Sequence, residues 1–438
     1  MQNGRIKEKN KKDLRNLMAN NTKPKKIIIG CHEICGWIAL LSKEFEKSGF
    51  EVITISPSTK YYKNQNYTLN KDHLARDYFI LRTKSKKIGA LIHFCYAILR
   101  TIFKFLIRKD IYNRLYIHAC SYLYKYADIY IHIWDGVEPN DNDLPKFKNN
   151  GTKIVSWFVG DDIRFYPAAI NEFEINNPYF LEYNKHEIYT PMRKLRLHEK
   201  FSDAIFSVPD QSSLALRPYF HLQIPIDLSK YTFKNTGNDI PLIVHIPSAP
   251  LLKGTPVFEK VINELFKEGL QFNFKYIIDI PNEEVRKILT EADILLDELY
   301  MHGPGMLGME AMASGCCVVV KHLEASPNCF KPPVVSVTIK TLKDKLRELI
   351  LNKKLREDLI IKGRSYVEEN NKASDVCKLI LEKIDSCNYD YYPSYFRDHF
   401  EAEQGYDFQK INEFTNMVKE YSWYKQFVKP GKRDKLVF

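Results

Sequence analysis

The sequence lacks the features that mark secreted, membrane-spanning and disulfide-rich proteins. Residues 1–26 are polar and basic, without the apolar core that a secretory signal needs. The most apolar stretch, residues 88–107, is interrupted by His93, Arg100 and Lys104, and a membrane-spanning helix tolerates such groups poorly. The 9 cysteines are odd in number and scattered. This pattern predicts reduced thiols in a cytoplasmic protein.

Signals for a metal centre and for nucleic-acid binding are also missing. Cys31, His32 and Cys35 form a cluster of metal-ligand type, but a second ligand pair is lacking, so core or loop cysteines are favoured over zinc. The net charge of +11 is moderate for 438 residues and suits anionic partners such as phosphorylated ligands or anionic lipid. No dense basic tract or nucleic-acid motif follows the N-terminal tail, so we expect no nucleic-acid partner.

The first half of the chain alternates strand-like and helix-like segments. An apolar run at 25–30 ends in glycine, a helical spacing covers 36–48, and a second apolar run follows at 50–55. This βαβ pattern predicts a parallel sheet. Further strands are expected at 129–133, 153–158 and 204–208. Each is followed by a polar or glycine-containing loop, and ligands of such sheets bind outside the carboxyl ends of the strands.

The second half repeats this α/β pattern after a short linker. Strands are expected at 241–246, 274–278, 293–296 and 316–320, and helices at 255–268, 282–291, up to Ser314, and at 342–370. Thr255 is expected to cap its helix, with Pro256 at the first helical position. The predicted parts are a basic tail (1–24), an N-terminal domain (25–230), a C-terminal domain (231–385) and a helical, aromatic extension (386–438).

Three elements of the second half suit a nucleotide diphosphate. Lys253 lies on a loop between a strand and a helix start, where an ammonium group can reach a diphosphate. The loop 303–308 leads into another helix, and its glycines permit close approach of backbone N–H groups to the same anion. Glu310, expected in the first turn of that helix, suits paired ribose hydroxyls. The alternatives are a solvated loop lysine and a carboxylate that only favours the helix dipole.

Three runs of the second half resemble a known family. They are HIPSAPLLKGT (245–255), ADILLDELYMHGPGMLGMEAMASGCCVVV (292–320) and LREDLIIKGRSYVEEN (355–370). Together they resemble the nucleotide-binding domain of family 4-type (group 1) glycosyltransferases. The looser N-terminal likeness rests on Gly36, on HIWDG (132–136) and on VGDDIR (159–164).

The resemblance implies an α/β protein of GT-B fold. Two Rossmann-like parallel-sheet domains would face a central cleft, with a helical C-terminal extension. It implies transfer of a sugar from a nucleotide-sugar donor, usually with retention at the anomeric carbon and with neither metal nor other cofactor. The catalytic residues it suggests are Lys253, His302, Asp162, Arg164 and His132. The donor-binding residues it suggests are Gly36, Ser248, Gly254, Thr255, Ile280, Gly305, Met306, Leu307 and Glu310.

The sequence departs from the family pattern at two positions. His302 stands where the family usually has the first of two glutamates, and Ser248 stands where it usually has an arginine. Arg164 is a candidate to replace that arginine, and His302 could stabilise charge or bind a sugar hydroxyl. Asp162 and Arg164 could instead form a structural ion pair. His132 could be a buried strand-end histidine without a catalytic role.

Residues 84–109 suggest a membrane contact. The segment 88–109 is apolar nearly all round, and His93, Arg100, Lys104 and Arg108 fall on one side of a helix. Such a helix lies in a membrane interface, although a buried helix with a basic edge fits as well. We therefore expect a cytoplasmic glycosyltransferase, peripheral at the inner face of the membrane, with a glycan or lipid-linked acceptor in cell-surface polysaccharide biosynthesis. The alternatives are a nucleotide-sugar epimerase and a non-catalytic binding protein of the same fold.

Overall fold

The computed structural model describes most of the chain between residues 25 and 385. The described ranges are 25–57, 67–83, 109–164, 189–207, 219–235, 237–301, 303–322 and 330–385. The predicted tail (1–24), the predicted extension (386–438), nearly all of the predicted membrane segment (84–109) and His302 lie outside these ranges. The chain divides into two compact units between Ser156 and Trp157, and the predicted domain boundary at residue 230 stays a prediction.

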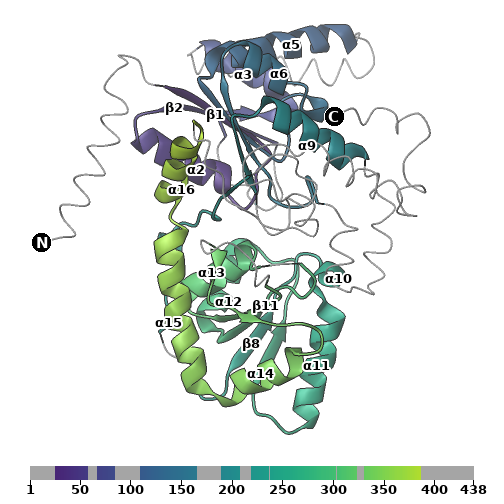
Figure 1. Ribbon diagram of the computed structural model, residues 1–438, viewed down its shortest axis with the longest axis vertical. Helices are drawn as coiled ribbons and strands as arrows, with labels where there is room; N and C mark the ends of the chain where they lie inside the picture. Colours follow the sequence, from purple (N-terminus) through teal and green to yellow (C-terminus); the bar gives the residue numbers. More distant parts are fainter. Residues whose placement is uncertain are drawn as a thin grey trace, which may run out of the picture. The chain divides into compact units, whose positions relative to one another are not determined.

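The N-terminal βαβ unit is confirmed. Strand β1 (Lys26–Cys31), helix α2 (Trp37–Lys47) and strand β2 (Glu51–Ser56) follow one another, and the two strands pair in parallel with Lys26 opposite Glu51. They belong to a seven-stranded sheet of order β3-β2-β1-β4-β5-β6-β7 (Figure 1). The other strands are β3 (Leu69–Asn70), β4 (Ile129–Ile133), β5 (Lys153–Trp157), β6 (Ala204–Ser207) and β7 (Phe220–His221).

Several helices beside this sheet were not predicted. They are α3 (Leu74–Thr83), α5 (Lys109–Tyr126), α6 (Leu144–Asn149) and α9 (Tyr189–Phe201), with short 3-10 turns η1 (Lys71–His73), η2 (Pro139–Asp141) and η4 (Leu228–Lys230). Helix α5 is rich in tyrosine, a residue that packs like an apolar side chain and also needs a hydrogen-bond partner. Its Tyr124 is buried while its hydroxyl donates to Glu138. Because tyrosine carries a polar hydroxyl, the buried face of α5 does not show in the sequence as a stripe of apolar residues.

The second sheet has five parallel strands in the order β12-β11-β10-β8-β9. They are β8 (Leu242–His245), β9 (Asn273–Tyr276), β10 (Ile294–Leu296), β11 (Cys317–Val320) and β12 (Val335–Ser336). Ile243, Ile294 and Val319 join one core cluster, while their neighbours Val244 and Leu295 are equally buried outside it. The central strands are therefore covered on both faces, which explains why they read as unbroken apolar runs.

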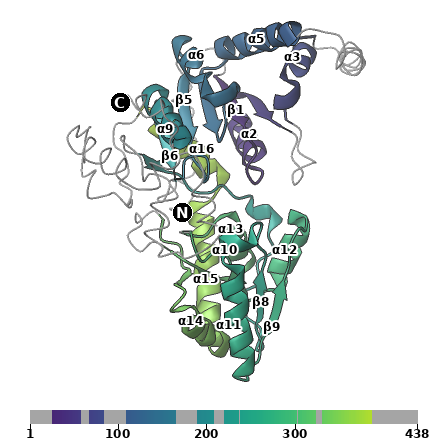
Figure 2. The same cartoon turned by 90° about the vertical axis from the view of Figure 1, so that its right-hand side faces the viewer.

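Helices of the second half pack against the faces of this sheet (Figure 2). Helices α11 (Thr255–Lys267), α14 (Leu342–Leu351) and α15 (Lys353–Asn370) supply the core cluster. Helix α13 (Met306–Ser314) packs against α12 (Asn282–Glu291) and α15. The short α10 (Pro250–Lys253) precedes α11, and α16 (Ala373–Lys383) ends the described chain.

Two details of these helices differ from prediction. The single helix expected at 342–370 is two helices, because the Asn352 side chain accepts the Leu355 N–H and starts a new helix there. Thr255 is not a cap but the first residue of α11, which follows Gly254 without a side-chain cap. The Thr255 hydroxyl instead bonds the His245 side chain.

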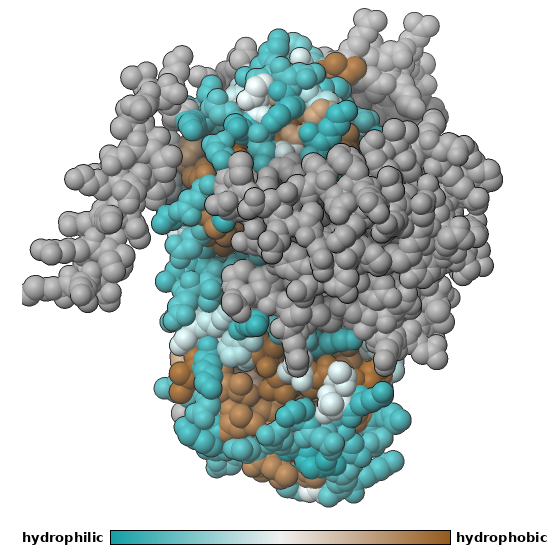
Figure 3. Space-filling model, viewed as in Figure 1, coloured by the Kyte–Doolittle hydropathy of each residue, from teal (hydrophilic) through white to brown (hydrophobic). Residues whose placement is uncertain are grey.

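Hydrophilic residues cover much of the visible face of the second half, with apolar residues between them (Figure 3). Within the described ranges, no helix combines the length and the apolar character that crossing a membrane requires.

Candidate functional site

Lys253 lies where α10 ends and α11 begins. The intervening Gly254 has a φ of 83°, and a Cβ there would lie 2.8 Å from the Leu299 side chain, so only glycine fits this turn. The Lys253 ammonium reaches back to the carboxyl end of β10, with Nζ 3.3 Å from Asp297 Oδ1 and 2.7 Å from Glu298 Oε2. Lys253 was expected on a loop but ends the short helix α10, whereas its predicted place between β8 and the start of α11 is confirmed.

The two carboxylates decide the charge of this lysine. Burial alone would lower the pKa of Lys253, but the charges of Asp297 and Glu298 outweigh it and raise the pKa above its usual value. Lys253 is therefore protonated and carries a positive charge. Burial raises the pKa of Glu298, and the Lys253 charge offsets that only in part. Sequence reasoning missed both carboxylates, although Asp297 and Glu298 follow a buried strand, which is the position where site residues gather.

The N–H groups of the glycine loop were expected to be free, but two of them are engaged in hydrogen bonds. The Gly303 N–H donates to the Lys321 carbonyl over 2.7 Å, and the Gly305 N–H lies 3.3 Å from Asp297 Oδ2. Helix α13 then begins at Met306. The N–H groups of the first helical residues, Met306 and Leu307, lack such intrahelical partners by geometry. These groups are the anion donors that this loop can offer.

Glu310 lies in the second turn of α13 and not in the first, because the helix already begins at Met306, four residues before it. The side chain is buried, and its Oε1 accepts from the Tyr231 hydroxyl at 2.8 Å and from the Asn282 amide at 2.9 Å. Burial raises the pKa of Glu310, and the two donors lower it in part. Tyr231 and Asn282 were not predicted, since they lie 79 and 28 residues away in sequence.

The remaining donor-side candidates are spread along the edge of the second sheet. Ser248 is exposed in the loop after β8, and Ile280 is half-buried just before α12. Thr255 is buried with its hydroxyl 2.8 Å from His245 Nε2. His245 Nδ1 lies 2.7 Å from the Leu296 carbonyl, so Nδ1 carries the proton and Nε2 accepts from the hydroxyl. The imidazole thus ties β8 to β10 and to the start of α11.

The predicted ion pair in the first half is formed by different partners. Arg164 pairs with Asp161, with Nη1 to Oδ1 at 3.3 Å, and no ion pair between Arg164 and Asp162 is found in the described part of the chain. The Asp162 carboxylate accepts the backbone N–H groups of Val159 and Gly160, the latter at 2.8 Å. An aspartate that binds the N–H groups of its own turn stabilises the loop. Gly36 has a φ of 82° and precedes α2.

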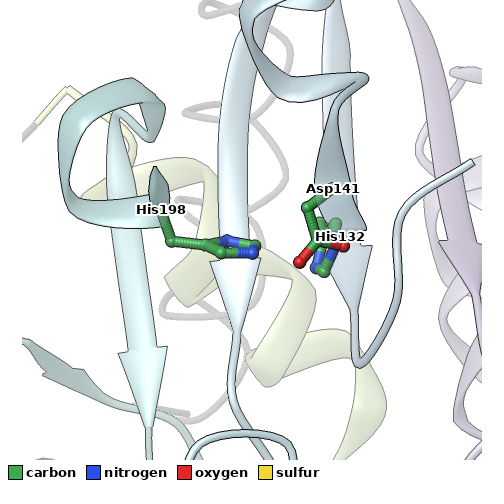
Figure 4. Close-up of side chains that lie close together, drawn as sticks. All are labelled: His132, Asp141 and His198. Carbon is green, nitrogen blue, oxygen red and sulfur yellow. The ribbon is translucent and has the colours of Figure 1, made fainter. Parts of the chain in front are cut away.

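His132 is buried in β4 and contacts an acid that was not predicted. Its Nε2 lies 2.9 Å from Asp141 Oδ1, which also accepts the Gly136 N–H at 2.8 Å. Figure 4 shows this pair with His198, and the potential ligand atoms of the three residues lie within 4.8 Å of one another. The polar run after β4 was the available signal for Asp141.

Comparisons with known proteins agree with this architecture. Residues 251–366 match the family described as "Glycosyl transferases group 1". No curated protein matches the chain. The crystal structure of TarM matches with a TM-score of 0.55 at 12% identity, over 83% of this chain and 99% of that one.

Two further structures give similar values. A mutant of S. aureus TarM in complex with Fondaparinux, alpha-GlcNAc-glycerol and UDP has a TM-score of 0.53 at 12% identity, over 83% of this chain and 100% of that one. Sucrose-phosphate synthase from Thermosynechococcus elongatus has a TM-score of 0.50 at 11% identity, over 82% of this chain and 98% of that one. The two parallel sheets and the match over residues 251–366 identify the chain as a glycosyltransferase of GT-B fold that resembles the group 1 family.

Proposed function

We propose that the protein transfers a sugar from a nucleotide-sugar donor to a glycan or lipid-linked acceptor in cell-surface polysaccharide biosynthesis. The observation that carries this proposal is the convergence of Lys253 and the Gly305 N–H on Asp297, beside the start of α13. An ammonium group and helix-start amides at the carboxyl edge of a parallel sheet form a binding site for a diphosphate.

The proposed reaction needs charge stabilisation on the leaving group. The bond between the anomeric carbon and the diphosphate oxygen breaks, a bond to the acceptor hydroxyl oxygen forms, and the hydroxyl proton is released. Negative charge grows on the leaving diphosphate, where Lys253 and the amides of Met306 and Leu307 would stabilise it. In this proposal these groups act in place of a metal ion, and the configuration at the anomeric carbon is retained.

Glu310 is proposed to bind the ribose of the donor. Its Oε1 already holds Tyr231 and Asn282, and no hydrogen bond of Oε2 is found among the described residues. A carboxylate fixed by one oxygen can offer the other to a sugar hydroxyl. His132, Asp162 and Arg164 are proposed to serve the acceptor side.

One of the TarM structures supports the classes of substrate. That protein is in complex with UDP and alpha-GlcNAc-glycerol, which favours a uridine nucleotide donor and a glycan-type acceptor here. We further propose that the protein works in the cytoplasm at the inner face of the membrane, with residues 84–109 as the contact. Vesicle sedimentation with anionic and neutral lipid tests that part.

A panel of nucleotide sugars, screened by thermal shift and then by calorimetry, tests the donor site. We expect at least one nucleotide sugar to bind, and Glu310→Gln to weaken it about 10-fold or more through the loss of a charged hydrogen-bond acceptor. Lys260→Ala, an exposed change on α11, is the matched control. Transfer is then assayed with acceptor extracts, with and without EDTA.

Each outcome separates the proposal from its rivals. Transfer that resists EDTA supports it. Turnover of the donor alone to an isomer would identify an epimerase, and tight binding without transfer to any acceptor would identify a non-catalytic binding protein. Loss of transfer in EDTA, restored by a divalent cation, would contradict the metal-independent mechanism.

A further inference from the structure

Asp297 contacts Lys253, which is assigned to the diphosphate, and the Gly305 N–H, which directly precedes the assigned amides of Met306 and Leu307. One carboxylate oxygen, Oδ1, lies 3.3 Å from Lys253 Nζ, and the other, Oδ2, lies 3.3 Å from the Gly305 N–H. These partners come from opposite directions in the sequence, 44 residues before and 8 residues after the aspartate. Asp297 therefore links two parts of the proposed site that are far apart in the sequence.

The backbone of Asp297 is fixed by the sheet. It directly follows β10, and its N–H donates to the Val319 carbonyl of β11 at 3.0 Å. The residue is 1% exposed. A side chain that extends from a paired strand and is enclosed has few accessible rotamers, so its two oxygens hold fixed positions.

Helix α13 is built to approach this carboxylate. A Cβ at Gly308 would lie 2.8 Å from Asp297 Oδ2 and 2.5 Å from the Pro304 side chain. Gly308 is buried in the first turn of α13, so the absence of a side chain there lets the helix start rest against the aspartate. The position of the helix amides thus depends on the same oxygen that accepts the Gly305 N–H.

Glu298 differs from Asp297 in what it holds. Its carboxylate contacts Lys253 at 2.7 Å, and no bond from it to the glycine loop is found in the described part of the chain. Besides Lys253, the charges acting on Glu298 are those of Asp297 and Arg164. Glu298 therefore only compensates the positive charge of Lys253, whereas Asp297 also connects Lys253 to the loop.

We propose that Asp297 is a positioning residue for donor binding, which holds the Lys253 ammonium and, through the Gly305 N–H, the start of α13 in the arrangement that a diphosphate requires. This inference rests on the proposed function. It predicts that the uncharged isostere in Asp297→Asn is a poor replacement, because an amide can accept with one atom only and must turn its NH₂ group toward either the ammonium or the N–H.

The test compares three single variants with the wild-type chain by titration with UDP and by donor kinetics. We expect Asp297→Asn to raise the UDP Kd and the donor KM about 10- to 100-fold, by analogy with the loss of residues that orient the ligands of a metal site. Glu298→Gln should bind UDP at least as tightly as the wild type, since it frees the ammonium. Glu291→Gln, an exposed carboxylate change on α12, is the control for a general charge effect.

A double-variant cycle with Lys253→Met separates positioning from mere packing. If Asp297 acts through Lys253, the Asp297→Asn effect on UDP affinity shrinks in the Lys253→Met background, and a packing role leaves it unchanged. Circular dichroism and melting temperature report folding. If Asp297→Asn does not fold, Gly308→Ala disturbs the same oxygen from the helix side and should weaken UDP binding likewise.

The inference is overturned if Asp297→Asn and Gly308→Ala fold and bind UDP like the wild type while Lys253→Met loses binding, and the donor site then stands without it. It is also overturned if Glu298→Gln weakens binding as much as Asp297→Asn, since the charge around Lys253 would explain both. A wild-type chain that binds no nucleotide would remove the proposed function and this inference together.

Discussion

The buried His245 imidazole makes the stability of the second half depend on pH. The side chain is fully buried, and both ring nitrogens are engaged by the Leu296 carbonyl and the Thr255 hydroxyl. Burial lowers the pKa of His245 from 6.5 to about 4, against the smaller opposing effects of the Leu296 carbonyl and the Asp297 charge. The folded protein therefore keeps this histidine neutral at pH values where the unfolded chain would bind a proton.

The sign follows from proton linkage. Between the folded and the unfolded pKa, the unfolded state binds more protons, so the stability is complete above about pH 6.5 and falls as the pH drops toward 4. This one residue should make unfolding about 2 kcal/mol easier at pH 5 than at pH 8. Urea unfolding followed by far-ultraviolet circular dichroism at the two pH values measures the effect.

Two variants isolate the contribution of the imidazole. His245→Gln should be less stable at pH 8, because it disturbs two buried hydrogen bonds, but its loss of stability between pH 8 and pH 5 should be smaller than that of the wild type by about 2 kcal/mol. Thr255→Val keeps the histidine and should keep the wild-type pH dependence. If His245→Gln loses as much stability on acidification as the wild type, the assignment of this pH dependence to His245 is wrong.

Two further changes test other parts of the account. Gly315, with a φ of 94°, ends α13, and a Cβ there would lie 2.0 Å from the Lys234 carbonyl oxygen; Gly315→Ala should lower the free energy of unfolding by about 2–4 kcal/mol, measured by urea unfolding, and a loss below about 0.5 kcal/mol would contradict the contact. Tyr231→Phe removes one donor from Glu310 and should weaken nucleotide binding about 3- to 10-fold by calorimetry, whereas the exposed Tyr276→Phe should not; equal affinities for both variants would argue against Glu310 as the ribose ligand.

The sheets could be predicted well because their strands are buried on both faces. The segment 129–133 is an unbroken apolar run apart from His132, and β4 covers those same residues. The helix at 282–291 was also predicted to the residue. Local patterns suffice for such elements, since each strand or helix shows its burial in its own residues.

The site was predicted only in part because its contacts are long-range. Lys253 and Glu310 could be named from their local setting, but the partners Asp297, Tyr231 and Asn282 come from other elements and leave no local pattern. The placement of Glu310 in the first turn was wrong because α13 already begins at Met306, inside the loop expected at 303–308. A helix start that tertiary contacts determine cannot be read from propensity alone.

The central proposal is that Lys253 and the amides at the start of α13 hold a diphosphate. A crystal structure of the protein, soaked with UDP or with a UDP-sugar that binds in solution, tests this directly. We expect diphosphate oxygens within about 3 Å of Lys253 Nζ and of an α13 amide nitrogen, with a ribose hydroxyl on Glu310. A nucleotide bound away from Lys253, or a diphosphate held only by groups outside residues 253 and 303–308, would contradict it.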